Sequence, residues 1–345
     1  MTASDFVTLR EITNQTAAWA EAIEKANALA SEIGRLAIGS QRQVICVGCG
    51  STHYLALSVA ALLQSRSGVV ARAFPASELL LNPDSAYVDG DTILVALSRS
   101  GATSETARVV ADFRARRLGK IVVVTNDAGS RIALNGDVVL AIAKGQEESV
   151  AQTRSFASMH VVAAAIADLV GLAPLGSAYK EALTACGDRL IDEHAELARR
   201  LANDRQIAQV FFLGNGPRYG LACEASLKLK EMSQTVSEPF HFLEFRHGPI
   251  SMVDGNTLVV GLVSESAYDH ETAVLNEIQA IGGRTLSLGE TDTDVAFGSG
   301  VPDHVRNVLY LPVLQLFAYH RAVASGKNPD KPRNLTAFIE LALET

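Results

Sequence analysis

A hydroxyl-rich stretch, Ser98-Arg99-Ser100-Gly101-Ala102-Thr103, has the residue types that bind an anion. It follows an apolar run, Thr92–Leu97, that predicts a buried strand, and it precedes a helical pattern with Gly119 as a stop signal. A turn between a strand and a helix exposes backbone N–H groups and the positive end of the helix dipole. The hydroxyls of Ser98, Ser100, Thr103 and the following Ser104, with the guanidinium of Arg99, add donors there, so we expect a phosphate site. The alternative is a helix cap, for which one hydroxyl suffices.

A second candidate group lies on the helix predicted after Gly214. Glu224, Lys228 and Glu231 are spaced i, i+4 and i+7, which places them on one helix face. One interpretation is a surface ladder of salt bridges, which is common on helices. The other is a ligand site, because this helix follows a glycine-rich turn at a strand end, where ligands bind in parallel sheets.

His247 is the third candidate, within Glu244-Phe245-Arg246-His247-Gly248-Pro249. The glycine and proline predict a tight, exposed turn beside the imidazole. A proton-transfer group would be useful in such a turn. A single histidine is more often structural, however, and the residues alone leave both interpretations open.

These groups need a scaffold of alternating strands and helices, and the pattern from Gln43 onward supplies one. Repeated strand–helix units of this kind predict a parallel sheet covered by helices on both faces. The predicted strands are Val44–Val47, Val69–Phe74, Thr92–Leu97, Ile121–Thr125, Val138–Ile142, Val210–Leu213, Leu258–Val263 and Arg284–Leu288. The predicted helices include 153–172, 179–201, 270–281 and 310–324, together with an alanine-rich N-terminal arm.

The second half of the chain repeats the first at a constant offset. Gly48 and Gly214 are 166 positions apart, and the same offset relates Gly50 to Gly216, Ser98 to Ser264, Glu105 to Glu271 and Thr106 to Thr272. So long a period indicates a duplicated domain and excludes a solenoid repeat. The second copy of the hydroxyl turn, Ser264–Asp269, has lost its glycine and gained two acids. We therefore expect a single phosphate site.

The bulk composition limits the classes of function. The 345 residues are 48% hydrophobic and 20% charged, which suits a large core and excludes a disordered chain. A net charge of −8 and an acidic N-terminal arm argue against nucleic acid as a partner. The longest apolar stretch, Val161–Leu172, is too short to span a membrane and carries Asp168. We expect a cytoplasmic protein without disulfides, metal or cofactor.

The motifs together resemble the sugar isomerase (SIS) family, and within it the isomerase domain of glucosamine-6-phosphate synthase and the SIS-type aminosugar-phosphate deaminases. The resemblance is carried by Gly48-Cys49-Gly50-Ser51-Thr52, the turn 98–103, the helix segment 224–231, Arg246-His247-Gly248-Pro249 and Pro332-Arg333-Asn334-Leu335. It implies an α/β fold of two tandem flavodoxin-like SIS subdomains in a homodimer. The expected division is a helical arm (1–40), a phosphate-binding subdomain (41–178), a catalytic subdomain (179–335) and a tail (336–345).

The resemblance also implies roles for individual residues toward a hexose or hexosamine 6-phosphate. Glu231 would be the base that moves a proton between C1 and C2, and Glu224 and Lys228 would be its neighbours. His247, donated across the dimer interface, would open the sugar ring. Sugar hydroxyls would meet the backbone near Val150 and Gln152. The phosphate would contact Ser51, Thr52, Ser98, Arg99, Ser100 and Thr103.

Two departures from the synthase narrow the expected reaction. Residues 1–40 are too few for its glutaminase domain, and Asn334–Thr345 contains no lysine for its Schiff base, which needs an amine nucleophile. We therefore expect a deaminase or isomerase that converts glucosamine-6-phosphate to fructose-6-phosphate and ammonia. The alternatives are an aldose–ketose phosphate isomerase, a glycated-amine phosphate deglycase and a non-catalytic sugar-phosphate-binding regulator.

Overall fold

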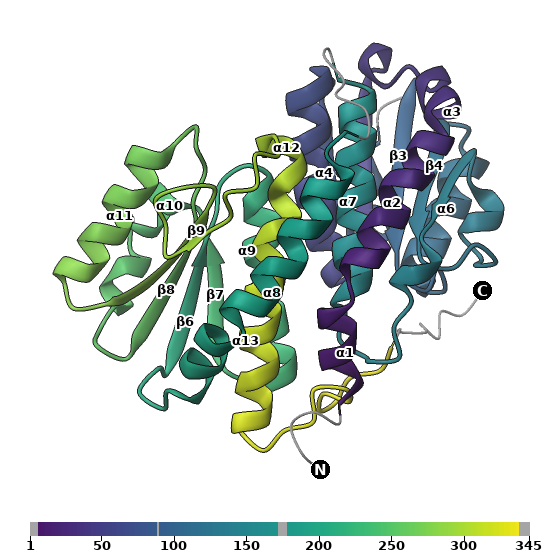
Figure 1. The fold of residues 1–345 in the computed structure, drawn as a ribbon. Coiled ribbons are helices and arrows are strands. Elements are labelled where there is room, and N and C mark those ends of the chain that lie inside the picture. The colour runs from purple at the N-terminus through teal and green to yellow at the C-terminus, as the bar shows by residue number, and fades with distance from the viewer. Residues whose placement is uncertain (1–5, 88–89, 172–177, 338–345) are drawn as a thin grey trace. The chain divides into compact units, whose positions relative to one another are not determined.

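The computed structural model describes residues 6–87, 90–171 and 178–337. The chain divides into two compact units. The N-terminal unit comprises Ala17–Glu147, Arg154–Lys180 and residues 336–337, and the C-terminal unit comprises residues up to Thr16, Glu148–Thr153 and Glu181–Leu335. Each unit contains one parallel sheet of five strands with helices on both of its faces (Figure 1).

The N-terminal unit has the strand order β2-β1-β3-β4-β5. Its strands are β1 (Gln43–Gly48), β2 (Ala71–Pro75), β3 (Thr92–Ser98), β4 (Gly119–Thr125) and β5 (Val138–Ala141). Its helices are α2 (Thr16–Ala28), α3 (Ala30–Arg35), α4 (Ser51–Ser67), α5 (Ala76–Leu81), α6 (Ser104–Ala115) and α7 (Arg154–Leu169), with short 3-10 turns η2 (Ile38–Ser40), η3 (Pro83–Ser85), η4 (Ala133–Asn135) and η5 (Ala143–Gly145).

Alternation along the strands creates two cores in this unit. Residues such as Ile45, Leu94 and Val123 face α5 and α6 and share a buried cluster with Phe113. The opposite face is covered by α4 and α7. Because both faces are covered, β1 and β3 are buried along their whole lengths, and they therefore read as continuous apolar runs in the sequence.

The C-terminal unit repeats this plan with the order β10-β9-β8-β6-β7. Its strands are β6 (Gln209–Leu213), β7 (Val236–Phe240), β8 (Thr257–Leu262), β9 (Arg284–Gly289) and β10 (Val295–Ala296). Its helices are α1 (Val7–Thr13), α8 (Lys180–Asn203), α9 (Pro217–Ser233), α10 (Phe242–Phe245), α11 (Tyr268–Ala280), α12 (Asp303–Arg306) and α13 (Leu311–Ala324), with 3-10 turns η6 (Pro249–Met252) and η7 (Asn307–Tyr310).

The duplication predicted from the sequence is present in the backbone. Helices α4 and α9 both have 17 residues and begin and end at the same offset of 166. Their N-caps, Gly50 and Gly216, adopt nearly the same conformation, with φ of 55° and 54° and ψ of −123° and −129°. Val44 pairs with Ala71 and Val210 with Ser237, so the register of the first strand pair is also repeated.

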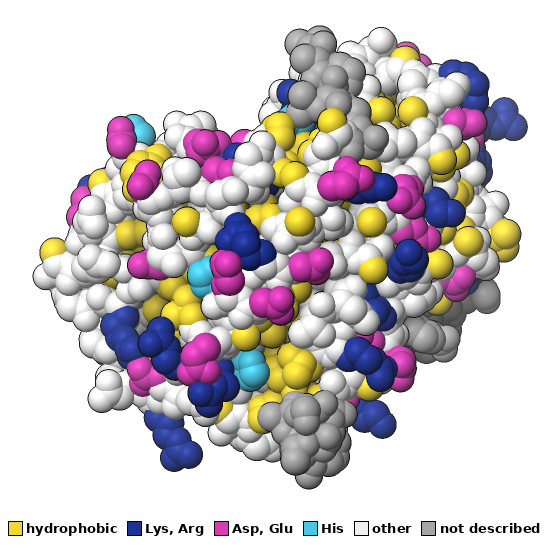
Figure 2. Space-filling model, in the orientation of Figure 1, with side chains coloured by type: hydrophobic (Ala, Val, Ile, Leu, Met, Phe, Trp, Pro, Cys, Tyr) yellow, Lys and Arg dark blue, Asp and Glu magenta, His cyan; other side chains and the backbone are white. Residues whose placement is uncertain are grey.

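Charged side chains of both signs are interspersed over the face shown in Figure 2. Among the described residues, no helix has the length and apolar character needed to cross a bilayer. The same residues contain no cluster of three or more His, Cys, Asp or Glu that could hold a metal ion. The four cysteines are free thiols, and burial raises the pKa of Cys223 to about 12.

Candidate functional site

The hydroxyl turn begins where β3 ends, at Ser98. The Gly101 N–H donates to Ser98 Oγ over 3.1 Å, and the Ala102 N–H donates to Ser100 Oγ over 3.2 Å. These bonds fix both hydroxyl oxygens as acceptors, and each hydroxyl can still donate its proton to an anion. The turn therefore presents fixed donors.

Thr103 is the N-cap residue of α6, and within the described residues its side chain makes no cap hydrogen bond. The same holds for the N-cap residues of α4, α9 and α11. The first N–H groups of α6 lie at the positive end of its helix dipole, which suits an anion. The phosphate site stays a prediction.

A second loop lies beside the turn, because β1 and β3 are neighbours in the sheet. Their carboxyl ends meet at the point where the strand order reverses, which is where ligands bind in open parallel sheets. Thr52 Oγ1 donates to the Cys49 carbonyl and accepts from the Cys49 N–H, both over 2.9 Å. Thr52 thus fixes its own loop. A Cβ at Gly48 would lie 2.6 Å from the Thr52 hydroxyl, which explains the glycine.

Both the backbone conformation at position 101 and the close packing around it require glycine. Its φ is +60°, a conformation that side chains other than glycine rarely adopt, and an added Cβ would lie 2.3 Å from Ser130 Cβ. Close packing against the segment 130–132 therefore holds the turn, and the Ile132 N–H also donates to the Gly101 carbonyl over 3.4 Å.

Arg99 is buried, with 7% of its side chain exposed. Its guanidinium lies 3.7 Å from Glu147 Oε2 and donates to the Ala337 carbonyl over 2.8 Å. Glu147 was not among the residues selected from the sequence. The structure thus brings Ser51, Thr52, Ser98, Ser100 and Thr103 to one edge of the N-terminal sheet, and it joins the Arg99 side chain to a neighbouring carboxylate.

The three charged residues of α9 lie in the C-terminal unit and contact one another along one helix face, as their spacing predicts. Glu224 is 1% exposed and Lys228 2% exposed, so the surface-ladder interpretation is wrong. The Lys228 ammonium lies 3.4 Å from Glu224 Oε1 and also forms an ion pair with Glu231. Glu231 keeps 18% of its side chain exposed. One buried cation therefore holds two carboxylates, of which Glu231 reaches solvent.

His247 lies in an exposed turn after α10, as the glycine and proline predict. Its N–H donates to the Glu244 carbonyl over 3.0 Å, and Gly248 follows with a φ of 131°. An ion pair between Arg246 and Glu277 fixes this turn to α11. Such a turn presents the imidazole at the surface, and its catalytic role stays a prediction.

Val150 and Gln152 lie in a segment of the C-terminal unit that is anchored by Asp330. The Val150 N–H donates to the Asp330 carbonyl over 3.0 Å, and the Asp330 carboxylate accepts from the N–H groups of Val7 and Thr8 at the start of α1. Gln152 Oε1 is buried, and the described residues offer it no hydrogen-bond donor. The contact of this segment with a sugar stays a prediction.

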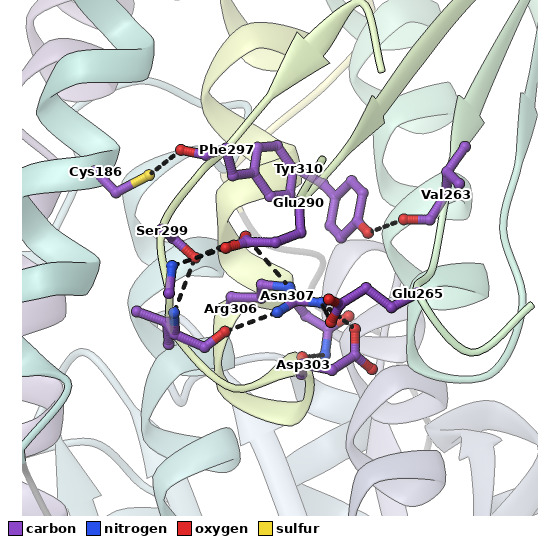
Figure 3. A network of polar contacts seen from close by, with 12 residues as sticks. Cys186, Val263, Glu265, Glu290, Phe297, Ser299, Asp303, Arg306, Asn307 and Tyr310 are labelled. Carbon is purple, nitrogen blue, oxygen red and sulfur yellow. Dashed lines mark hydrogen bonds and ion pairs between the residues drawn. The ribbon is translucent and has the colours of Figure 1, made fainter. Parts of the chain in front are cut away.

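The second copy of the turn is occupied by the protein's own charges. The Ala267 N–H donates to Ser264 Oγ over 3.2 Å, which repeats the Gly101–Ser98 bond at the offset of 166. Here, however, the Ser264 N–H donates to Glu271 over 2.6 Å, and Arg306 forms an ion pair with Glu265 (Figure 3). Glu265 and Asp269, which stand where the first copy has Arg99 and Thr103, would repel a phosphate, whereas Glu271 has a counterpart in Glu105. The single phosphate site stays a prediction.

Comparison with known proteins supports the family resemblance seen in the sequence motifs. A family model for the SIS domain matches residues 37–169 and 205–294. The glutamine–fructose-6-phosphate aminotransferase of Pyrobaculum aerophilum is 32% identical over 318 residues, 88% of this chain and 52% of that protein. The enzyme of the same name from Clostridium tetani is 27% identical over 89% of this chain and 53% of its own. The chain thus spans about half the length of these relatives.

Solved structures extend the likeness over nearly the whole chain. The glucosamine-6-phosphate deaminase of Thermotoga maritima superposes with a TM-score of 0.84 at 25% identity, covering 97% of this chain and 99% of that one. The tagatose-6-phosphate ketose/aldose isomerase of Escherichia coli gives 0.84 at 22% identity, covering 97% of each chain, which shows a common fold. With two matched segments, a repeated parallel sheet and one hydroxyl turn, the chain belongs to the SIS domain family.

Proposed function

We propose that the chain is a phosphosugar deaminase/isomerase that acts on glucosamine-6-phosphate or a close aminosugar phosphate. The hydroxyl turn and the loop after β1 would recognise the phosphate through Ser51, Ser98, Ser100 and Thr103, with Thr52 and Arg99 holding the two loops in place. Binding the phosphate would use energy remote from the reacting carbons to position them.

The observation that carries the proposal is that Glu231 is both ion-paired and partly exposed. This carboxylate is paired with a buried ammonium and still keeps 18% of its side chain exposed, whereas Glu224 and Lys228 are buried. A base for proton transfer needs a fixed oxygen that a substrate can reach. Glu231 meets both requirements.

The proposed chemistry needs only proton transfers and water. His247, from a second subunit of a homodimer, would move a proton as the ring opens to the C1 aldehyde. Glu231 would remove the C2 proton, and return of a proton at C1 would leave an imine at C2. Water would add to that carbon, and the C–N bond would break to give ammonia and fructose-6-phosphate.

One assay tests this assignment. The protein is incubated with glucosamine-6-phosphate, and both ammonia and fructose-6-phosphate are measured. We expect equal amounts of the two products and no turnover by Glu231→Gln. Glu238→Gln, which changes an exposed carboxylate on β7, is the matched control and should remain active. Absence of ammonia at high enzyme concentration would exclude a deaminase for this substrate.

A plain aldose–ketose isomerase is the second candidate, because Glu231 would perform the same C1–C2 proton transfer on a C2 hydroxyl. Incubation with glucose 6-phosphate separates the two, since the isomerase would form fructose-6-phosphate without ammonia. A non-catalytic regulator would bind the sugar phosphate and release neither product.

A further inference from the structure

The second residue of the hydroxyl turn forms an ion pair in both copies, with the charges exchanged. Arg99 and Glu265 are equivalent at the offset of 166. Arg99 pairs with Glu147, which lies between β5 and α7, and Glu265 pairs with Arg306, which lies between β10 and α13. Each turn is thus joined to the segment that follows the last strand of its own sheet. The partners themselves are not at the repeat offset, since Glu147 would correspond to Val313, so what the two turns share is a paired charge at their second residue.

The pair in the first copy is built into the interior. Arg99 has 7% and Glu147 0% of the side chain exposed. Glu147 also accepts a hydrogen bond from Ser155 in the first turn of α7. On the opposite side, the Arg99 carbonyl accepts from the Asn126 N–H over 3.1 Å and from the Thr125 hydroxyl over 3.2 Å at the end of β4. Arg99 therefore connects the turn to two neighbouring elements.

The corresponding network of the second copy is larger (Figure 3). Arg306 lies 3.2 Å from Asp303 and 3.6 Å from Glu290, in addition to Glu265, and it donates to the Val301 carbonyl over 2.8 Å. Glu265 is 57% exposed, whereas the Arg99–Glu147 pair is buried. A desolvated pair fixes geometry strictly, because either charge alone would be costly to leave in the interior.

We propose that Arg99 is a positioning residue that acts through Glu147, and that it holds the hydroxyl turn in its anion-binding conformation without itself ligating the phosphate. The inference rests on the proposed function, since it concerns the same phosphate site. In this arrangement the ligands of the phosphate are hydroxyls and N–H groups, and the guanidinium contacts Glu147 and the Ala337 carbonyl.

Glu147→Gln separates this role from direct ligation because the two roles predict opposite signs. If Arg99 bound the phosphate, removing a nearby negative charge would strengthen binding of an anion. If the pair positions the turn, the same change weakens binding, by about tenfold to a hundredfold if the loss is like that of an orienting partner at a metal site. The probes are inorganic phosphate, followed by calorimetry, and turnover of glucosamine-6-phosphate.

The positioning role also predicts a kinetic pattern. Glu147→Gln should raise KM with little change in kcat, because the residues proposed for proton transfer are untouched. Glu147→Asp keeps the charge and should restore part of the affinity. Asp112→Asn removes a carboxylate from the exposed Arg116–Asp112 pair on α6 and is the matched control, for which we expect unchanged binding.

Removal of both charges is the second test. Arg99→Met alone leaves Glu147 buried without its cation and should weaken phosphate binding, and the double variant Arg99→Met/Glu147→Met, which leaves no unpaired charge, should recover part of the loss. A direct ligand would not be rescued, since the double variant still lacks the guanidinium. Tighter or unchanged phosphate binding by Glu147→Gln would overturn the inference, as would a double variant no better than Arg99→Met.

Failure of the proposed function gives a different result. If Ser100→Ala/Thr103→Ala leaves the affinity for phosphate unchanged, the turn is not a phosphate site at all. If that variant loses phosphate binding while Glu147→Gln retains it, the site is correct and only the positioning role is wrong.

Discussion

Replacing Gly101 with alanine should disrupt the hydroxyl turn by two separable effects. The first is backbone strain, because Gly101 has a φ of +60°. The second is steric, because the new Cβ would lie 2.1 Å from Ser130 Oγ and 2.3 Å from Ser130 Cβ. The second copy shows the alternative conformation, since Ala267 at the equivalent position has a φ of −127°.

The expected loss of stability follows from these two effects. Left-handed backbone costs an alanine about 1–2 kcal/mol. Forcing an extra methyl group into packed surroundings costs about 1–3 kcal/mol. Gly68→Ala is the matched control, because Gly68 has a φ of +74° with nothing within 4 Å of the added Cβ. The control should therefore lose the strain energy alone, and Gly101→Ala should lose about 2–5 kcal/mol.

A double-mutant cycle with Ser130→Gly isolates the steric effect. Ser130 Oγ is buried and has no hydrogen-bond partner among the described residues, so its removal breaks no side-chain hydrogen bond there. The coupling free energy between the two positions should be about 1–3 kcal/mol, most of the overlap, because the next nearest atom to the new Cβ is Ile132 Cγ1 at 3.1 Å. Urea unfolding gives the free energies, and the thermal shift on adding inorganic phosphate reports the anion site.

We expect phosphate to stabilise the wild type and Gly68→Ala, and to stabilise Gly101→Ala far less. Equal losses for Gly101→Ala and Gly68→Ala, without coupling to Ser130, would refute the steric argument. A full phosphate shift in Gly101→Ala would show that the positive φ is not needed for the anion site.

Three further predictions concern other groups. Ser100→Ala/Thr103→Ala should raise KM for glucosamine-6-phosphate with a smaller effect on kcat, and an unchanged KM in steady-state kinetics would contradict the phosphate assignment. Lys228→Met should lower the free energy of unfolding by about 3–5 kcal/mol, because it leaves the buried Glu224 without its cation; Glu224→Gln added to it should restore part of that loss in urea titrations. Burial lowers the pKa of His160 from 6.5 to about 4, so the folded protein holds this ring neutral. The stability of the fold is therefore highest, as far as His160 is concerned, above pH 6.5, and it falls as the pH drops toward 4. That loss reaches about 3 kcal/mol, and His160→Gln should flatten the dependence of stability on pH over this range.

The sequence was sufficient for the buried strands and for the edge strands β2 and β5 of the N-terminal sheet, and it missed both edge strands of the C-terminal sheet. β1 and β3 are buried on both faces, so their apolar runs are unambiguous. β7 (Val236–Phe240) was missed because it contains Glu238 and Pro239, which are tolerated at an edge where one side of the strand needs no partner. β10 was missed because two residues give no periodic pattern.

The candidate site was predictable where it depended on local spacing. The shared face of Glu224, Lys228 and Glu231 follows from helix geometry, and the exposed turn of His247 follows from its glycine and proline. The partner of Arg99 was not predictable, because it depends on the path of the chain after β5, which no periodicity encodes. The burial of Lys228 could not be predicted either, since charged residues at helical spacing indicate a solvated face as readily as a buried one.

The duplication separates what the fold requires from what a ligand requires. Features present in both copies belong to the architecture: the positive φ of Gly50 and Gly216, the serine oxygen that accepts an N–H three residues later, and the carboxylate of Glu105 or Glu271. Features that differ are the candidates for the function. Gly101 keeps the first turn in a conformation that Ala267 has left, and the second turn has Glu265 and Asp269 where the first has Arg99 and Thr103. The first turn therefore lacks the two acids that the second turn carries.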